Sequence, residues 1–117
     1  MRANNLTLLT DFYELTMMQG YFKNPTNQTV IFDMFYRTNP CGGSFAITAG
    51  LEQMIEYIEN LHFSEEDIEY LRGLHIFQED FLDYLSTFRF TGDIYAIREG
   101  TVVFPREPIV KVIPPIM

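Results

Sequence analysis

One short segment near the start of the chain limits the possible folds most strongly, because it predicts a helix that is apolar on two opposite sides. Residues 8–22 read LLTDFYELTMMQGYF and predict a helix over residues 10–22, with Thr10 as its N-cap and Asp11 in its first turn. At about 100° per residue, the side chains fall into two stripes on opposite sides of the axis. The first stripe is Phe12, Leu15, Met18 and Phe22, and the second is Tyr13, Thr16, Met17 and Gly20.

The two stripes predict two different contacts. We expect the first stripe to pack in the core of its own domain. The second stripe combines the ring of Tyr13, the small gap at Gly20 and the flexible side chain of Met17, which suits a partner surface or a planar ligand. Aromatic residues at helical spacing are nevertheless most often core residues, so the residue pattern leaves both roles open for Tyr13.

Composition excludes several classes of protein. The 117 residues predict a single domain with one modest core. Sixteen acidic and eight basic residues give a formal charge of -8, which argues against nucleic acid as a partner. A hydrophobic content of 47% is too high for a disordered chain, and no apolar run reaches the roughly 18 to 20 residues that span a bilayer. With no signal-peptide pattern and one cysteine, we expect a soluble cytoplasmic protein without membrane contact.

Changes of hydrophobic period predict an α+β fold, in which helices pack on a mostly antiparallel sheet. We expect residues 29–37 to form a strand that is largely covered on both sides. Two hairpins are predicted among the last three strands, one across Glu99-Gly100 and one across the PREP segment 105–108. The other expected elements are a short strand at 44–48, helices at 50–61, 63–73 and 78–88, and strands at 93–98, 101–104 and 109–113.

The predicted helix over residues 63–73, FSEEDIEYLRG, has the clearest local signals. Ser64 is the expected N-cap, and three acidic residues follow it in the first turn. Phe63 and Ile68 occupy the two positions of a hydrophobic staple, and Gly73 is expected to end the helix. The carboxylates of this helix and of QED at 78–80 are best explained as partners of the helix dipole rather than as acid-base groups.

Few residues of the chain predict chemistry. His62 and His75 lie beside predicted helix ends without an obvious nucleophile or carboxylate partner, so we interpret both as ordinary histidines. Cys41 and the two histidines lack the spacing of metal ligands, and we expect neither a metal site nor a catalytic residue in this chain.

Cys41-Gly42-Gly43 and Arg37 each have two interpretations. The glycine pair is explained by a turn with positive φ, which we favour, or by a loop that approaches a phosphate. Arg37 lies at the end of an apolar strand. A cation there extends its charged end to solvent, forms an ion pair with a carboxylate such as Asp33, or binds an anion. From the sequence alone we take the ion pair as the default interpretation.

The end of the chain is unusual, because it stops directly after PPIM without a polar tail. We expect the chain to be a fragment of a longer protein, with a natural terminus lying in a groove as the alternative.

Several motifs occur together in one order. These are TDFYELTM at 10–17, FDMFYRTNPCGGSFAITAGLE at 32–52, FSEEDIEYLRGL at 63–74, and FRFTGDIYAIREGTVVFPREPIVKV at 88–112. In this order and over almost the whole chain, they resemble the amino-terminal region of nicotinate phosphoribosyltransferase. Each piece alone is a weak signal. Cys41 departs from the pattern, because an aromatic residue is common there.

The resemblance implies that residues 1–117 are the amino-terminal α+β domain of a type II phosphoribosyltransferase whose α/β barrel is absent. Such enzymes join nicotinate to phosphoribosyl pyrophosphate, forming nicotinate mononucleotide for NAD biosynthesis, with ATP hydrolysis and magnesium. They are homodimers in which two subunits share each active site. The resemblance also implies that the histidine phosphorylated by ATP lies beyond this region, so we expect the chain alone to be inactive and to bind no cofactor.

The resemblance assigns roles to two residues. Tyr13 is the tyrosine of TDxYxLTM, which in the family lies against the pyridine ring of nicotinate. Arg37, in FYRTNP, is the candidate for a phosphate contact made across the dimer. The alternatives are a stand-alone protein-interaction module whose partner covers the Tyr13 stripe, and a relative that uses nicotinamide or quinolinate.

Overall fold

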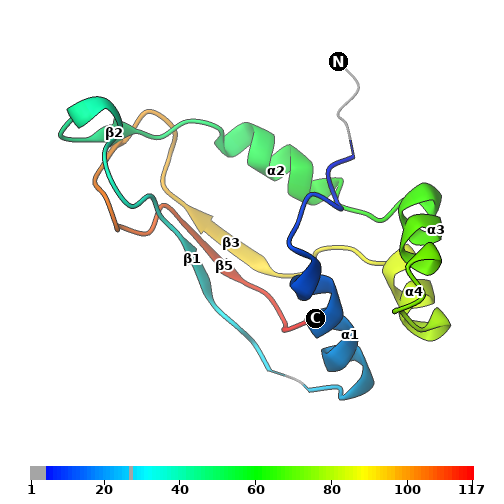
Figure 1. Cartoon of the computed structure of the whole chain (residues 1–117). Coiled ribbons are helices and arrows are strands. Elements are labelled where there is room, and N and C mark those ends of the chain that lie inside the picture. Colours follow the sequence, from blue (N-terminus) through cyan, green and yellow to red (C-terminus); the bar gives the residue numbers. More distant parts are fainter. Residues whose placement is uncertain (1–4, 27) are drawn as a thin grey trace. The chain divides into compact units, whose positions relative to one another are not determined.

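A computed structural model describes residues 5–26 and 28–117 (Figure 1). The elements follow one another in the predicted order, with a 3-10 turn in addition, and every strand pair is antiparallel, which confirms the α+β class. The helices are α1 (Phe12–Lys23), α2 (Leu51–Glu59), α3 (Glu65–Gly73) and α4 (Glu79–Ser86), and the 3-10 turn is η1 (Pro40–Gly42). The strands are β1 (Phe32–Met34), β2 (Ala46–Ile47), β3 (Asp93–Ala96), β4 (Val102–Val103) and β5 (Val110–Ile113).

The chain forms two compact units. The helical unit contains α1, α3, α4 and the last two residues, Ile116–Met117. The sheet unit consists of residues Gln28–Glu59 and Thr91–Pro115, and therefore contains β1 to β5 and α2. Each unit is assembled from segments far apart in the sequence, so neither forms from one continuous stretch.

The helical unit holds the main hydrophobic core. Phe81, Leu82 and Leu85 of α4 are 0% exposed, as their helical spacing predicts. The ring of Phe81 lies 5.7 Å from that of Phe22 and 5.8 Å from that of Phe77, so aromatic contacts join α1, α4 and the loop before α4. The remaining buried members are Leu15, Phe63, Ile68, Leu71 and Phe77, and Phe88 packs against them as a partly buried residue.

The start of α3 confirms the predicted cap. The Asp67 amide donates to Ser64 Oγ at 3.1 Å, and the Ser64 amide donates to Asp67 Oδ2 at 2.8 Å, which completes a capping box. Phe63 and Ile68, at the two staple positions, are both buried. The helix ends at Gly73 as expected, but it is His75 that adopts a positive φ, of 55°.

The sheet unit contains a three-stranded sheet in the order β1-β5-β3 and a separate pair, β2-β4. The two predicted hairpins are therefore wrong. Gly100 of the first predicted turn donates its amide to Thr48 O at 2.9 Å, and Arg106 of the second donates its amide to Tyr36 O at 2.8 Å. Both turns thus bond to earlier parts of the chain, and these long-range contacts direct β4 to β2 and β5 to β1 and β3.

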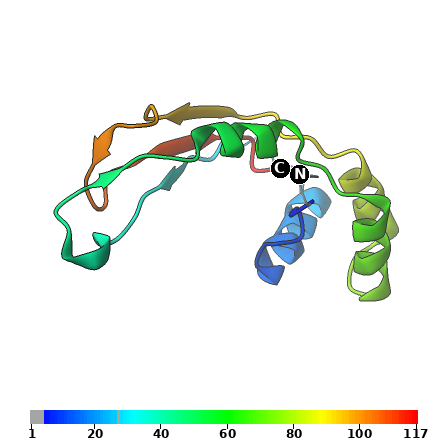
Figure 2. The same ribbon diagram turned by 90° about the horizontal axis from the view of Figure 1, so that it is seen from above.

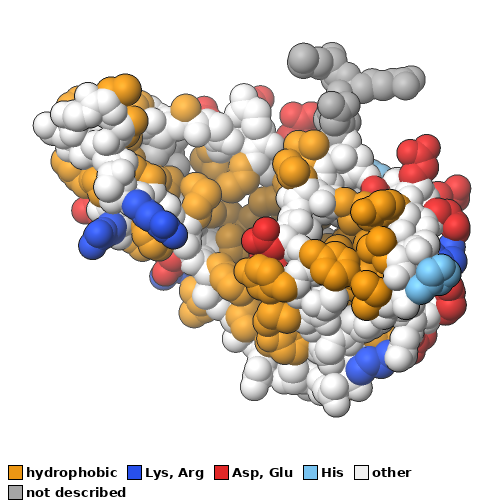
Figure 3. All heavy atoms as spheres, viewed as in Figure 1, with side chains coloured by type: hydrophobic (Ala, Val, Ile, Leu, Met, Phe, Trp, Pro, Cys, Tyr) orange, Lys and Arg blue, Asp and Glu red, His pale blue; other side chains and the backbone are white. Residues whose placement is uncertain are grey.

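Strand β1 is shorter and more open than the sequence predicts. Only Phe32–Met34 of the expected residues 29–37 form a strand, beyond which Thr29 makes an isolated bridge to Pro115. All three residues of β1 are exposed, and Phe32 is 63% exposed. The expectation of a strand covered on both sides is therefore wrong for the part of the chain that the structure describes. Apolar side chains reach the surface at many places (Figure 3).

Helix α2 lies over the three-stranded sheet within the sheet unit (Figure 2). Its first turn is capped from a distant loop, because Glu99 Oε1 accepts hydrogen bonds from the amides of Gly50 at 2.8 Å and Leu51 at 2.6 Å. A carboxylate at this end of a helix also complements the helix dipole. Glu99, expected in a hairpin turn, therefore holds the start of α2 instead.

Candidate functional site

Helix α1 turns one apolar stripe into the core of the helical unit, as predicted. Leu15 is 7% exposed, and Met18 and Phe22 pack against the buried cluster. The Phe12 ring makes an edge contact with Phe77 at a centroid distance of 5.9 Å, although Phe12 keeps about half of its surface exposed. This stripe accounts for the attachment of α1 to its own unit.

The second stripe of α1 is left open. Tyr13 is 58% exposed and Met17 is 49% exposed, and a Cβ atom added at Gly20 would meet nothing within 4 Å. Within the described residues, the Tyr13 ring makes no aromatic contact and its hydroxyl has no hydrogen-bond partner. Its backbone oxygen accepts a bond from Thr16 Oγ1 at 2.9 Å. The Tyr13 ring is therefore free to lie against a planar ligand or another protein surface.

The start of α1 differs from the prediction in one detail. The helix begins at Phe12 and its N-cap is Asp11, whose side chain makes no capping hydrogen bond. Thr10 is not the N-cap, because its hydroxyl bonds to the side chain of Glu14 one turn further along. This bond gives the Thr10 hydroxyl a partner, but it leaves the backbone amides of the first turn without a hydrogen bond from a capping side chain.

Arg37 lies in the bend after β1, in the sheet unit, and its side chain is exposed. Among residues 5–26 and 28–117, neither Arg37 nor Asp33 takes part in an ion pair, so the default pairing of these two residues is wrong there. The backbone beside Arg37 is nevertheless held firmly. The Tyr36 hydroxyl shares its hydrogen between Val103 O and Asn39 Oδ1, each at 2.9 Å.

Arg106 is a neighbour of Arg37 that the sequence analysis missed. The hydrogen bond from the Arg106 backbone amide to Tyr36 O brings Arg106 beside the peptide group that joins Tyr36 to Arg37. Arg106 adopts a φ of 65°, is exposed, and makes no ion pair with any described residue. Arg37 and Arg106 are therefore two exposed arginines without ion pairs to described residues, on backbone segments joined by a hydrogen bond, and two such cations favour an anion. Only the pairing of the PREP turn with residues 34–36 reveals this neighbour, and no local signal predicts that pairing.

The remaining candidate residues stay separate. Cys41 and Gly42 have φ values of 55° and 68°, which confirms the turn interpretation of the Cys-Gly-Gly segment. His62 Nδ1 lies 2.7 Å from Asn60 O, and both histidines are exposed. In the described ranges no three His, Cys, Asp or Glu side chains are grouped to hold a metal ion. No described helix is long and apolar enough to cross a membrane.

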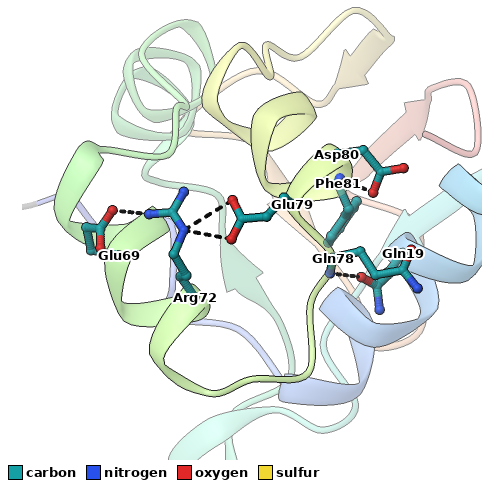
Figure 4. A network of polar contacts seen from close by, with 7 residues as sticks. All are labelled: Gln19, Glu69, Arg72, Gln78, Glu79, Asp80 and Phe81. Atoms are coloured by element: carbon teal, nitrogen blue, oxygen red, sulfur yellow. Dashed lines mark hydrogen bonds and ion pairs between the residues drawn. The ribbon is translucent and has the colours of Figure 1, made fainter.

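Polar contacts link the helices of the helical unit (Figure 4). Arg72, in the last turn of α3, binds the side chains of Glu69 and Glu79, and its Nε lies 2.9 Å from Glu79 Oε1. The hydrogen bond that Arg72 donates to Glu79, followed by the one it donates to Glu69, raises the pKa of the Arg72 guanidinium. On the other side of α4, a hydrogen bond from Lys23 lowers the pKa of the Asp80 carboxyl.

Comparison with known proteins identifies the family. The family model of the nicotinate phosphoribosyltransferase N-terminal domain matches residues 8–117. The chain belongs to the nicotinate phosphoribosyltransferase family. It is 46% identical over 110 residues to nicotinate phosphoribosyltransferase pncB2 of Mycobacterium tuberculosis, covering 94% of this chain and 24% of the relative. The nicotinate phosphoribosyltransferase of Bacillus subtilis is 38% identical over 117 residues, covering 99% of this chain and 24% of the relative.

A solved structure supports the same assignment. The crystal structure of human nicotinic acid phosphoribosyltransferase matches with a TM-score of 0.78 and 27% identity, over 91% of this chain and 22% of the human chain. The chain thus spans about a quarter of the length of the nicotinate phosphoribosyltransferases that it matches. These comparisons confirm the resemblance drawn from the ordered motifs.

Proposed function

We propose that this chain acts as the amino-terminal part of an enzyme that joins nicotinate to phosphoribosyl pyrophosphate, giving nicotinate mononucleotide for NAD biosynthesis. Family membership supports the reaction, because the relatives are named for it. The observation that carries the proposal is the open second stripe of α1, where Tyr13 presents an unpartnered ring.

Tyr13 contacts the pyridine ring of nicotinate in this proposal. An aromatic pair contributes about 0.5 to 1.5 kcal/mol beyond the burial of apolar area, which is enough to orient a ring but not to form a bond. The hydroxyl lacks a partner among the described residues, so the ring rather than the hydroxyl is the part of Tyr13 that the proposal needs. Its role is to place the nicotinate nitrogen for attack on the anomeric carbon of the phosphoribosyl group.

Arg37 binds a phosphate of the second substrate across a homodimer, and the two subunits share each active site. The absence of an ion pair for Arg37 in the described chain supports this role, since a partnered guanidinium would have to be released first. Arg106, beside it, adds a second positive charge.

The proposal includes ATP hydrolysis and magnesium for the full enzyme, located in the cytoplasm. The described residues do not fit a magnesium site, because they hold no group of three suitable ligands, and we assign no step of the reaction to this chain through the metal.

The test is a direct assay of the full-length enzyme. We expect nicotinate mononucleotide to form from nicotinate, phosphoribosyl pyrophosphate and ATP, with nicotinamide and quinolinate as much poorer substrates. The 117-residue chain, assayed in parallel, should show no turnover. A full-length protein that prefers nicotinamide or quinolinate would contradict the substrate assignment. A full-length protein without any such activity, but with a protein partner on the Tyr13 stripe, would favour the interaction module.

A further inference from the structure

The rotation of helix α1 about its own axis decides where Tyr13 points, and apolar packing sets that rotation only coarsely. Both of its stripes carry large apolar side chains, with Leu15 and Phe22 on one and Tyr13 and Met17 on the other. Burial of apolar area has no preferred direction around a helix axis. A half-turn of α1 would replace Leu15 and Phe22 in the core with Thr16 and Gly20, so apolar packing favours the observed side of the helix. The exact angle of α1 about its axis, which sets the direction of Tyr13, needs directional contacts as well.

The side chain of Gln19 makes two directional bonds to the loop between α3 and α4. Its Oε1 accepts a hydrogen bond from the Gln78 amide at 2.7 Å (Figure 4), and its Nε2 donates to Ile76 O at 3.3 Å. The donor and the acceptor of the amide are thus used at once, on backbone groups two residues apart. We call these two hydrogen bonds the Gln19 clamp. Gln78 is also the N-cap residue of α4, so the clamp connects α1 to the start of that helix.

The position of Gln19 on α1 makes this clamp sensitive to rotation. Gln19 lies about 40° from Leu15 around the axis and about 120° from Tyr13, at the border of the core stripe. Hydrogen bonds weaken steeply when their angle or length departs from the optimum. Rotation of α1 by even one residue spacing, about 100°, would separate Gln19 from both partners.

Lys23 repeats the pattern one turn later on the same side of α1. Its Nζ lies 2.5 Å from Asp80 Oδ2, in the first turn of α4. Both side chains of this ion pair are substantially exposed, so it stabilises little by itself. Together, the two links join one edge of α1 to the start of α4, but only the Gln19 link uses backbone groups with fixed positions.

We propose that Gln19 is a positioning residue that fixes the rotation of α1 about its axis and so aims Tyr13 at the substrate. The inference rests on the proposed function for its effect on activity. It also predicts a structural effect that does not depend on activity, because Gln19 accepts the hydrogen bond of the Gln78 amide and should slow its hydrogen exchange whether or not a substrate binds.

The first experiment compares three variants of the full-length enzyme. Gln19→Leu removes both bonds at similar volume, and Gln19→Glu keeps an acceptor for Gln78 but loses the donor to Ile76. Gln53→Leu, on the exposed side of α2, is the matched control. We expect Gln19→Leu to raise the KM for nicotinate about two- to tenfold, the equivalent of one ordinary hydrogen bond, and Gln19→Glu to raise it less. The KM for phosphoribosyl pyrophosphate and the control variant should stay within about twofold of wild type.

The second experiment asks whether Gln19 acts through Tyr13. In a double-mutant cycle, Gln19→Leu should have little further effect on the nicotinate KM once Tyr13→Ala is present. Equal effects in both backgrounds would overturn the positioning role, as would a nicotinate KM that Gln19→Leu leaves unchanged in an active enzyme.

Hydrogen exchange separates this inference from the proposed function. The Gln78 amide should exchange faster in Gln19→Leu than in wild type, and Gln53→Leu should leave it unchanged. If the wild-type enzyme forms no nicotinate mononucleotide, the proposed function fails and the role of Gln19 is decided by this exchange alone. An unchanged exchange rate at Gln78 would refute the clamp.

Discussion

The replacement Phe81→Ala tests the account of the helical core. Phe81 is 0% exposed, and its ring lies within 5.7 to 6.4 Å of the rings of Phe22, Phe77 and Tyr84. Truncation of a fully buried phenylalanine costs about 3 to 5 kcal/mol, and three aromatic neighbours place Phe81 toward the upper end. Because small domains are stable by only about 5 to 15 kcal/mol, the variant should lose a large share of its stability.

Urea unfolding of the 117-residue chain, followed by far-ultraviolet circular dichroism, measures this loss. A loss of about 4 kcal/mol, at an m-value of about 1.5 to 2 kcal/mol/M, lowers the urea midpoint by about 2 to 3 M. Tyr70→Ala is the matched control, since Tyr70 lies on α3 of the same unit and is 62% exposed. Its midpoint should change by less than about 0.5 M. A Phe81→Ala midpoint no lower than that of Tyr70→Ala would refute the reasoning.

Three further predictions follow from the cap, the ion pair and Arg37. Ser64→Ala should destabilise the chain by about 1 kcal/mol in urea unfolding, because it removes half of a capping box; no change would contradict the cap. Lys23 lowers the pKa of Asp80 in the folded state, so this carboxylate stabilises the fold above its unfolded pKa and loses that effect as the pH falls through its folded pKa. The stability difference between wild type and Asp80→Asn should therefore be small at neutral pH, where the exposed pair is screened, and should shrink further below about pH 4, whereas a difference that grows in acid would oppose it. In the full-length enzyme, Arg37→Ala should raise the KM for phosphoribosyl pyrophosphate about tenfold and leave that for nicotinate nearly unchanged, and the reverse pattern would exclude the phosphate contact.

Local signals in the sequence predict the helices well. The cap at Ser64 and the staple at Phe63 and Ile68 act within one turn, so their structural outcome depends on few other residues. The inward residues of α4 follow from spacing in the same way. The N-cap of α1 moved by one residue because the Thr10 hydroxyl has a competing partner in the Glu14 side chain, which propensity does not weigh.

The sheet shows what local signals miss. The sequence around Glu99-Gly100 has the composition of a hairpin turn, yet Gly100 bonds to Thr48 and Glu99 caps α2, about fifty residues away along the chain. Such pairings depend on contacts between distant segments that composition does not encode. The same limit hid Arg106, which becomes a neighbour of Arg37 only through its bond to Tyr36. The helical wheel left both a core role and an outward role open for Tyr13, and only the resemblance of the ordered motifs favoured the exposed position that the ring takes.

The central claim is that the outward ring of Tyr13 contacts nicotinate, and the nicotinate KM of the full-length Tyr13→Ala enzyme tests it most directly. A ring contact contributes about 0.5 to 1.5 kcal/mol beyond the burial of apolar area, so its loss corresponds to a rise of about two- to tenfold or more. We expect that rise with ATP hydrolysis much less affected, and Tyr13→Phe should stay within about threefold of wild type because the hydroxyl has no partner in the described chain. A nicotinate KM that Tyr13→Ala leaves unchanged would contradict the account and remove Tyr13 from the substrate site.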